Sequence, residues 1–461
     1  MWERQYRGEQ HHGQAADTHG KEVRLEQKFS LWVGIDWATE EHQVCGVDAD
    51  GKKVFEWKVA HAGDAIGELA DRLIGKAGGA VDQVAVAIET PRGAIVEALI
   101  DRGIAAFSIN PKQADRFRDR HRVSGAKSDA LDAFVLADSL RTDMPLYRRI
   151  ELGDAVVVEL RELNRAHVAL TRDGTALGSR LREQIHRYYP QILELGSPYE
   201  DRWLWDLLEL APTPAEGARI SRAKVERILS SNRIRTVNAE DVVKKLRDKA
   251  LPVAPGVVAA ASAHMRLLLP LVRLNRQQLA DCDRQIKALV TRLATPQNTT
   301  LAKEGDETGT ETPAQRPPDA AILLSVPGLG IHSTAAILTE GWQALRDRDY
   351  QALRTQSGSA PVSSQTGKQR HATSSRHKVQ VSQRYSCNGH LQVAAYHWAR
   401  GAMMHEDRAK AHYARLRAAG HSHGRALRGV ADRLLKMLVA MLASGSLYDP
   451  NRRALPEVAA A

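Results

Sequence analysis

Short apolar runs dominate the first third of the chain. From Leu31, the runs LWVGIDWA, HQVCGVDA and KKVFEWKVA follow one another closely, which predicts an antiparallel meander of three strands. Two segments with helical spacing, AIGELADRLIGKA and GAIVEALIDRG, then alternate with two strand-like runs, VDQVAVAIE and IAAFSIN. A further helix is predicted in KSDALDAFVLADSLRTD. The order β-β-β-α-β-α-β-α indicates a mixed α/β layer.

The middle of the chain has a helical pattern instead. An a/d-like spacing predicts two long helices that pair as an antiparallel coiled coil. The residues that keep this spacing are Leu160, Leu163, Leu170, Leu177 and Leu181, and later Leu279, Ile286 and Leu293. Between them, RWLWDLLEL and AEDVVKKLRDKAL predict shorter helices. Beyond residue 318 the chain is again mostly helical in pattern, with an irregular polar segment near 355–388.

These changes of pattern divide the chain into expected segments. Residues 1–28 are polar and without periodicity, as in disordered leaders. Residues 295–318 contain almost no large apolar side chains, as in linkers. We expect a leader (1–29), an α/β domain (30–148), a helical coiled-coil region (149–295), a linker (296–318), a mostly helical C-terminal domain (319–448) and a tail (449–461).

Composition narrows the class of protein. The chain has 461 residues and a net charge of +10, which favours a polyanionic partner. We find no uninterrupted apolar run of membrane-spanning length and no secretory signal, so neither a membrane protein nor a secreted one is expected. Cys45, Cys282 and Cys387 lie far apart and form no CxxC pair, which argues against a cysteine-based zinc site and indicates a reducing, cytoplasmic setting.

Four carboxylates in the α/β region form the strongest chemical pattern. Asp36 lies within an apolar strand-like run, Glu89 ends another, and Asp129 and Asp132 are three residues apart on one helix face. Each has an ordinary explanation as a turn cap, a loop start or part of a solvated helix face. Together they would repel one another unless cations lay between them, and hard oxygen ligands suit Mg²⁺ or Mn²⁺ in phosphodiester chemistry.

Two regions offer basic surfaces for nucleic acid. The first leads into the Asp129 helix and is either a phosphate-binding run or an ordinary solvated helix. Its cations are Lys112, Arg116, Arg118, Arg120, Arg122 and Lys127. The second extends from Tyr350 to His405 and contains no Asp or Glu. We expect nucleic-acid contacts there from Lys368, Arg370, Arg376, Lys378 and Arg384.

The segment SVPGLGIHSTAAILTEG, residues 325–341, predicts two helices joined by a glycine turn. Gly328 and Gly330 would let backbone N–H groups approach a phosphate, and the following helix N-terminus favours anions. This pattern is similar to a helix-hairpin-helix element, although an ordinary interhelical turn explains it equally.

The motifs VGIDWATEEH, AIETPRGAIVEAL, GIAAFSINPKQADRFRDRH and GAKSDALDAFVLAD resemble the N-terminal domain of DEDD insertion-sequence transposases, a family that includes the Piv/MooV DNA invertases. In that family the domain is RuvC-like, with a ribonuclease H-like fold. The resemblance implies that Asp36, Glu89, Asp129 and Asp132 are the tetrad that binds Mg²⁺. The actin-like kinases share that fold, but DWATEEH has no glycine for their phosphate turn.

The resemblance resumes from about residue 321 to 450, in SGSAPVSSQTGKQ, RYSCNGHLQVAAYHWA and HYARLRAAGHSHGRALRGVADRLL. In the family this domain supplies a serine that attacks DNA, commonly just before a glycine that follows a Gly-x-x-Pro motif. Here Thr366 stands in that position, before Gly367. Ser364 and Ser363 lie two and three residues earlier, so all three hydroxyls are candidates for the nucleophile.

The sequence thus predicts a DNA transposase or site-specific recombinase that cuts and rejoins strands with a metal-binding tetrad and a hydroxyl. The resemblance also implies DNA ends and a target as substrates, a structured guide RNA, a homo-oligomer and a prokaryotic cytoplasmic, nucleoid-associated location. Two alternatives remain at this point. One is a RuvC-like invertase or nuclease, and the other is a catalytically degraded nucleic-acid-binding remnant.

Overall fold

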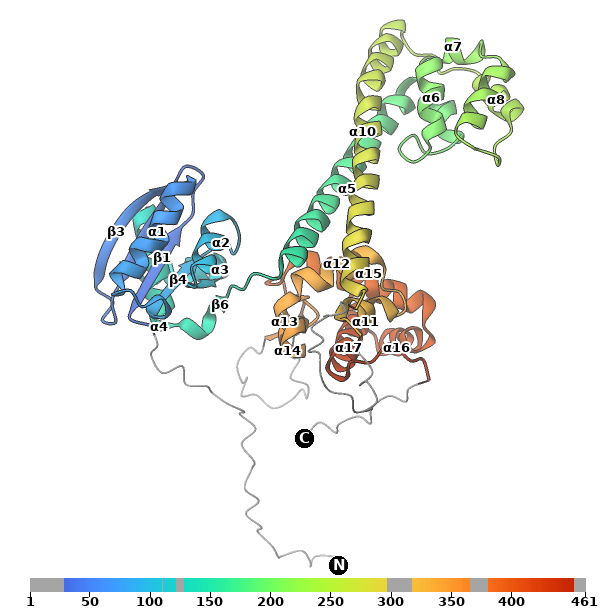
Figure 1. Cartoon of the computed structure of the whole chain (residues 1–461). Helices are drawn as coiled ribbons and strands as arrows, with labels where there is room; N and C mark the ends of the chain where they lie inside the picture. The colour runs from blue at the N-terminus through green and yellow to red at the C-terminus, as the bar shows by residue number, and fades with distance from the viewer. Residues whose placement is uncertain (1–28, 110, 122–127, 297–316, 365–379, 452–461) are drawn as a thin grey trace, which may run out of the picture. The chain divides into compact units, whose positions relative to one another are not determined.

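The computed structural model describes residues 29–109, 111–121, 128–296, 317–364 and 380–451. By their contacts the residues form two compact units, Met1–Leu152 and Gly153–Ala461, and each unit is described by itself (Figure 1). Nearly all of the expected leader, linker and tail lies outside the described residues. The expected domain boundaries within the second unit therefore stay predictions.

A sheet of six strands, in the order β3-β2-β1-β4-β5-β6, forms the centre of the first unit. The strands are β1 (Leu31–Asp36), β2 (Glu41–Val47), β3 (Lys53–Ala60), β4 (Val84–Ile88), β5 (Ala105–Ser108) and β6 (Arg148–Arg149). β1, β2 and β3 pair antiparallel in sequence order, which confirms the predicted meander. β1, β4 and β5 run parallel, and β6 pairs antiparallel with β5.

Helices cover the sheet on both faces. They are α1 (Gly63–Lys76), α2 (Ala94–Asp101), α3 (Pro111–His121) and α4 (Asp129–Thr142), with short 3-10 turns at Val81–Gln83 and Met144–Leu146. Successive side chains of a strand point to opposite faces. Accordingly Val33 and Ile35 of β1 join the core that includes α1 and α2, whereas Trp32 joins the core that includes α4. The predicted mixed α/β layer is confirmed.

The second unit is mostly helical. Its first part comprises α5 (Ala155–Tyr188), a 3-10 turn (Pro190–Glu194), α6 (Arg202–Leu210), α7 (Pro214–Ala218), α8 (Arg222–Ser231), α9 (Ala239–Leu246) and α10 (Pro255–Ala294). Its second part comprises α11 (Asp319–Ser325), α12 (Ile331–Glu340), α13 (Trp342–Arg346), α14 (Tyr350–Gln356), β7 (Val362–Ser364), β8 (Gln380–Ser382), α15 (Gly389–His405), α16 (Asp407–Ala418) and α17 (His423–Ser444).

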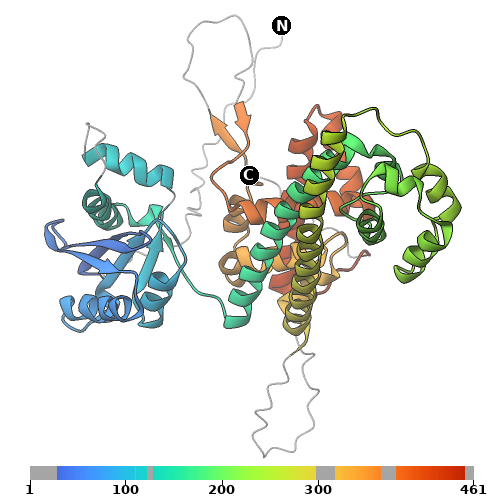
Figure 2. The same cartoon turned by 90° about the horizontal axis from the view of Figure 1, so that it is seen from above.

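The long helices α5 and α10 lie side by side along most of their length (Figures 1 and 2). Asn275 donates a hydrogen bond to the carbonyl of Leu170, and Cys282 donates one to the carbonyl of Leu163. Because the residue number rises on one helix as it falls on the other, the pair is antiparallel. The predicted pair of helices is confirmed, while coiled-coil packing stays a prediction.

The sequence analysis expected no membrane-spanning segment, but α10 passes a test for one that is based on length and composition. By length and composition alone this helix is apolar enough to cross a membrane, and 33% of its most apolar window is buried within the protein. Met265, Val272 and Ile286 of α10 enter hydrophobic cores shared with α5. Packing against other helices therefore accounts for much of its apolar character.

Separate cores lie at the two ends of this helix pair. One combines α6, α8 and α9 with the end of α5 and the beginning of α10, around Tyr188, Trp203 and Leu208. The other combines α11 to α17 around the fully buried Trp398. The polar segment near 355–388 was expected to be irregular. Its described residues include the β7–β8 pair, which Figure 2 shows as two adjacent arrows.

Candidate active site

Asp36 and Glu89 lie next to each other at one edge of the sheet. Asp36 is the last residue of β1, and Glu89 follows Ile88, the last residue of β4. The two strands are parallel, with Ile35 opposite Ile88. Both carboxylates therefore leave the sheet at the carboxyl end of neighbouring strands, where ligands gather in open α/β sheets.

The first turn of α4 brings in the other two carboxylates, Asp129 and Asp132. Ser128 caps this helix, since its hydroxyl accepts a hydrogen bond from the N–H of Leu131 at 3.2 Å. Negative side chains are favoured in the first turn of a helix because its free N–H groups carry partial positive charge. Local sequence thus stabilises two acidic side chains where the helix meets the site.

Gly34 allows α4 to lie directly on β1. A Cβ atom at this position would stand 1.9 Å from the carbonyl oxygen of Ala133 and 2.6 Å from the N–H nitrogen of Ala137. Only a residue without a side chain permits so close an approach. The glycine before Ile35 and Asp36 therefore sets how near the α4 carboxylates come to the strand carboxylates.

The electrostatics of Asp36 reflect the three neighbouring carboxylates. The pKa of Asp36 is raised to about 6, first by burial and then by repulsion from Asp132, Asp129 and Glu89, while Arg118 lowers it. Such a shift is expected where carboxylates share a confined space with too little positive charge. The described part of the first unit therefore contains an acidic cluster that is only partly compensated.

Arg118 of α3 supplies the compensating charge. Its Nε donates to Oδ1 of Asp132 at 2.5 Å, its Nη1 donates to Asp115 at 2.6 Å, and its Nη2 lies 3.8 Å from Oε1 of Glu89. The sequence assigned Arg118 to nucleic-acid binding, and that role stays a prediction. Sequence reasoning did not foresee that this guanidinium lies among the carboxylates themselves.

The other cations of this run are placed as follows. Arg116 and Arg120 are exposed on α3, and Arg120 lies 4.0 Å from Asp143. Lys112 is within α3, but its side chain is not described, and Arg122 and Lys127 lie outside the described residues. Contacts of these five residues with nucleic acid remain predictions.

In the second unit, Ser363 and Ser364 belong to β7, where they pair with Val381 and Gln380 of β8. Their side chains are not described, and Thr366 lies outside the described residues. The choice among the three hydroxyls therefore stays a prediction.

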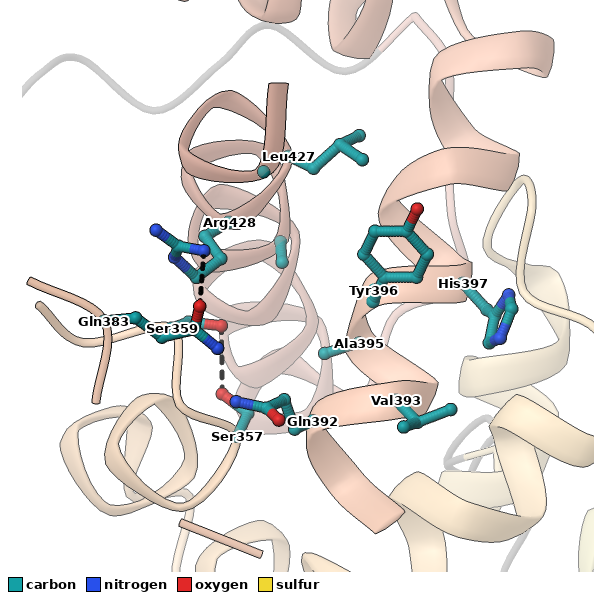
Figure 3. Close-up of a pocket in the computed structure, with 12 residues that line it drawn as sticks. Ser357, Ser359, Gln383, Gln392, Val393, Ala395, Tyr396, His397, Leu427 and Arg428 are labelled. Atoms are coloured by element: carbon teal, nitrogen blue, oxygen red, sulfur yellow. Dashed lines mark hydrogen bonds between the residues drawn. The ribbon is translucent and has the colours of Figure 1, made fainter. Parts of the chain in front are cut away.

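The earlier serines Ser357 and Ser359 are buried and joined by a hydrogen bond of 3.0 Å (Figure 3). They line a pocket of about 370 Å³ between α15 and α17, where Arg428 donates to Gln383 at 3.0 Å. Ser357 also donates to the carbonyl of Arg354. These two hydroxyls thus serve internal hydrogen bonds.

The segment from Tyr350 to His405 contains no carboxylate in its own sequence, but in the folded protein a carboxylate from another helix contacts it. Asp432 of α17 accepts two hydrogen bonds from Arg354, at 2.9 and 3.0 Å, and one from Tyr350 at 2.8 Å. A count along the sequence misses Asp432 because it lies 78 residues from Arg354.

Of the cations assigned to nucleic acid in this region, Arg384 is partly buried, and its Nε has no hydrogen-bond partner among the residues that the structure describes. The others, which lie outside the described residues, are Lys368, Arg370, Arg376 and Lys378.

The glycine turn between α11 and α12 has a packing reason. Gly328 adopts a φ of +76°, and a Cβ there would stand 2.3 Å from the N–H nitrogen of Ala402 on α15. Gly330 caps α12, and a Cβ there would meet nothing within 4 Å. Close approach to α15 thus explains Gly328 without a phosphate, whereas the space around Gly330 is open. Helix-hairpin-helix binding stays a prediction.

A buried ion pair that the sequence did not reveal joins α5 to α12. Arg165 donates to both carboxylate oxygens of Glu340, at 2.7 and 3.0 Å, and Asn388 donates to Glu340 at 2.7 Å. Burial raises the pKa of Glu340, but these hydrogen bonds and the Arg165 charge outweigh it, so the net pKa is lowered. No local pattern signals this network, because its cation and anion are 175 residues apart.

Comparison with known proteins defines the class of this chain. Residues 33–190 match the DEDD-type IS110 transposase family, described as "Transposase". Over 444 residues the chain is 31% identical to the "Mini-circle putative transposase for IS117" of Streptomyces coelicolor, covering 95% of this chain and 99% of that protein. Over 209 residues it is 44% identical to "Putative transposase y4uE" of Sinorhizobium fredii, covering 45% of this chain and 58% of that protein.

The protein is therefore an insertion-sequence transposase, an enzyme class that binds, cuts and rejoins DNA. Within that class it belongs to the DEDD-type family of the IS110 and IS117 elements, which confirms the family resemblance identified from sequence. A protein of insertion element IS110 from Streptomyces coelicolor is also similar, with 24% identity over 94% of this chain. Members of this family commonly use divalent metal ions.

Proposed function

We propose that the first unit is a ribonuclease H-like, RuvC-like catalytic domain that cuts DNA at the Asp36, Glu89, Asp129 and Asp132 cluster. The observation that carries the proposal is the meeting of two strand-end carboxylates with two carboxylates in the first turn of a helix. The raised pKa of Asp36, to about 6, supports it, because it shows that these groups interact. The strand order β3-β2-β1-β4-β5 also fits such a fold.

The donor set fits a hard divalent cation. All four side chains offer carboxylate oxygens, which Mg²⁺ and Mn²⁺ prefer, and their excess of negative charge is met in this structure only in part, by Arg118. When bound, such a cation polarises the scissile phosphodiester and lowers the pKa of an attacking hydroxyl or water. Arg118 would then be free to pair with a phosphate oxygen, since a guanidinium matches phosphate geometry.

We propose that the second unit supplies the attacking hydroxyl, from Ser364, Thr366 or Ser363. An alcohol oxygen is a weak nucleophile until its proton is withdrawn and the phosphate is polarised. Attack forms a phosphate ester with the protein and releases one DNA strand end, which a later transfer rejoins. The β-methyl group of a threonine would hinder this attack, so Ser364 is the first candidate to test.

Further parts of the proposal concern assembly. A homo-oligomer held by α5 and α10 would let the two units of different copies complete one site, in a nucleoid-associated, cytoplasmic setting. DNA ends and target would lie on the basic residues of α3 and of the segment 368–384, together with a structured guide RNA. The net charge of +10 supports polyanionic partners in general.

A covalent-adduct experiment tests the proposal. The full-length protein is incubated with its element's end DNA, the element's RNA and Mg²⁺, and denaturing gels are examined for protein–DNA adducts. We expect adducts with the wild type, none with Asp129→Asn, and undiminished adducts with Asp119→Asn, a matched change at an exposed aspartate of α3. Full recombination by Asp129→Asn would refute the role of the tetrad.

Two further variants assign the nucleophile in the same assay. If Ser364 attacks, Ser364→Ala abolishes adducts and Thr366→Ala leaves them, and the reverse result assigns Thr366. Adducts that survive both changes point to Ser363. The comparisons with transposases do not favour the invertase, nuclease or remnant alternatives, and the absence of wild-type adducts under all conditions would reopen them.

A further inference from the structure

A cluster of histidines and an aspartate lies where three helices of the second unit meet. His167 is on α5, Asp283 on α10 and His332 in the first turn of α12. The Nε2 atoms of His167 and His332 lie 2.9 and 3.0 Å from the same oxygen, Oδ1 of Asp283. One ligand atom from each residue lies within 4.8 Å of the other two.

The donor set has the character of a zinc site. Zn²⁺ prefers imidazole nitrogen and carboxylate oxygen at about 2.0–2.1 Å in a tetrahedral arrangement, so its ligand atoms stand roughly 3.3 Å apart. The two nitrogen–oxygen separations are within a few tenths of an ångström of that value. Cys282 precedes Asp283, but its thiol is directed to the carbonyl of Leu163, so it is not part of the set.

The two imidazole rings of the cluster lie face to face. They stack at a centroid distance of 4.1 Å with an interplanar angle of 14°, so protonation of both would place like charges face to face. Neutral imidazole is the form with a free lone pair, and it is therefore the form that binds metal.

The cluster is also reachable. The side chains of Asp283 and His332 are 49% and 45% exposed, while that of His167 is 18% exposed. A cation can enter from solvent, and a water molecule can complete its coordination. The position matters for the fold because α12 belongs to the C-terminal core, whereas α5 and α10 form the long helix pair.

We propose that His167, Asp283 and His332 bind one Zn²⁺ ion that joins the α5–α10 pair to α12. This site is separate from the carboxylate tetrad, which has no imidazole and lies in the other unit. Its ligands come from residues 167, 283 and 332, so a bound ion links segments far apart in the chain. The ion stabilises this junction in the folded protein, because the unfolded chain does not hold the three ligands together.

Zinc titration of the metal-free, full-length protein tests the proposal. Calorimetry should show one equivalent of Zn²⁺ that is lost in His332→Ala and in Asp283→Asn. It should be retained in His264→Ala, a matched change at an exposed histidine of α10, and in Asp129→Asn of the tetrad. With Zn²⁺ at about a hundred times its Kd, the wild-type melting temperature should rise on the order of 5 °C.

Cobalt substitution gives a second measurement that needs no variant. Co²⁺ bound by imidazoles shifts their ring N–H proton resonances far outside the normal NMR range, which carboxylates of the tetrad cannot do. We expect two such imidazole signals, displaced by Zn²⁺. Absence of these signals, or a zinc equivalent that persists in both His332→Ala and Asp283→Asn, would overturn the proposal and leave an internal hydrogen-bonded cluster.

Discussion

Asp36 in the first unit and Glu340 in the second are both substantially buried carboxyl groups, yet their pKa values move in opposite directions. Asp36 is surrounded by Asp132, Asp129 and Glu89, and its pKa rises to about 6. Glu340 is held by Arg165 and Asn388, and its pKa falls. Burial acts in the same sense on both, so the partners decide the outcome.

The opposite pKa shifts distinguish a buried carboxylate with a structural role from one that favours binding of a cation. Around Glu340 the charge and the hydrogen bonds are satisfied within the protein, which is the mark of a structural contact. Around Asp36 the carboxylates outnumber the cations that face them, which is the mark of a site that gains stability from a ligand of positive charge. The following predictions test this contrast, from the largest expected effect to the smallest.

Asp36→Asn should reduce DNA strand transfer by at least about 10³-fold, because the proposed metal site loses one oxygen ligand and its charge. The same change should not lower the stability of the metal-free protein, since it relieves repulsion. Strand-transfer assays and thermal unfolding without divalent ions measure the two effects. Loss of stability together with activity would place Asp36 in the same structural class as Glu340.

Arg165→Met should lower the free energy of unfolding by about 3 kcal/mol, because it leaves the Glu340 carboxylate buried without its cation. Urea unfolding measures the change. Arg172→Met, at an exposed arginine of the same helix, should alter stability by no more than about 0.5 kcal/mol. The double variant Arg165→Met with Glu340→Leu should regain much of the loss; if it does not, the pair is not the cause.

Gly34→Ala should cost about 2–3 kcal/mol, because the new methyl group forces α4 away from β1. Strand transfer should fall as well, since Asp129 and Asp132 move with the helix. Gly75→Ala is the control, because a Cβ at this helical position of α1 meets nothing within 4 Å, and it should stabilise by about 0.5–1 kcal/mol. Equal effects of the two substitutions would show that α4 does not depend on Gly34.

The two carboxyls should also give opposite pH dependences. The raised pKa of Asp36 contributes stability that is present below about pH 4 and is lost as the pH rises to about 6. After allowance for solvent screening, this amounts to roughly 1–2 kcal/mol in the metal-free protein. The lowered pKa of Glu340 contributes stability that is present above its unfolded value and is lost as the pH falls.

Urea unfolding from well below pH 4 up to pH 7.5, without divalent ions, measures both slopes, because the contribution of Glu340 is lost only below its unfolded pKa. Asp36→Asn should remove the decrease in stability between pH 4 and 6, and Arg165→Met should remove the gain that the Glu340 pair gives. A pH profile unchanged by Asp36→Asn would mean that the acidic cluster does not raise the pKa of this group.

Sequence patterns predicted the elements that depend on local spacing. The meander, the strands at β4 and β5 and the helices α1, α2, α4, α5 and α10 all follow from apolar periodicity, which reports which side of an element is buried. The pattern did not reveal β6 or the β7–β8 pair, because Arg148–Arg149 and the serines of β7 carry no apolar alternation.

In the candidate site too, features set by local sequence spacing could be predicted, and contacts between distant elements could not. An apolar run that contains Asp36, another that ends in Glu89 and the three-residue spacing of Asp129 and Asp132 were visible in the sequence. The structure ends β1 at Asp36 and places all four carboxylates near one edge of the sheet. The roles of Arg118, Arg165 and Asp432 were not visible. Each depends on a partner supplied by another element, and a pairing of that kind follows from the tertiary fold alone.

The contacts of Asn388 bear on which part of this enzyme can change in sequence and length. Its side chain caps α15 and donates to Glu340, while its backbone N–H donates to the carbonyl of Gln356 at 2.8 Å. This hydrogen bond holds together the two ends of the chain segment between Gln356 and Asn388. The segment contains all three candidate hydroxyls. Because the entropy of closing a chain segment grows only slowly with its length, residues can be inserted, deleted or shifted there, and the candidate hydroxyls moved with them, without a change to the domain that holds both ends.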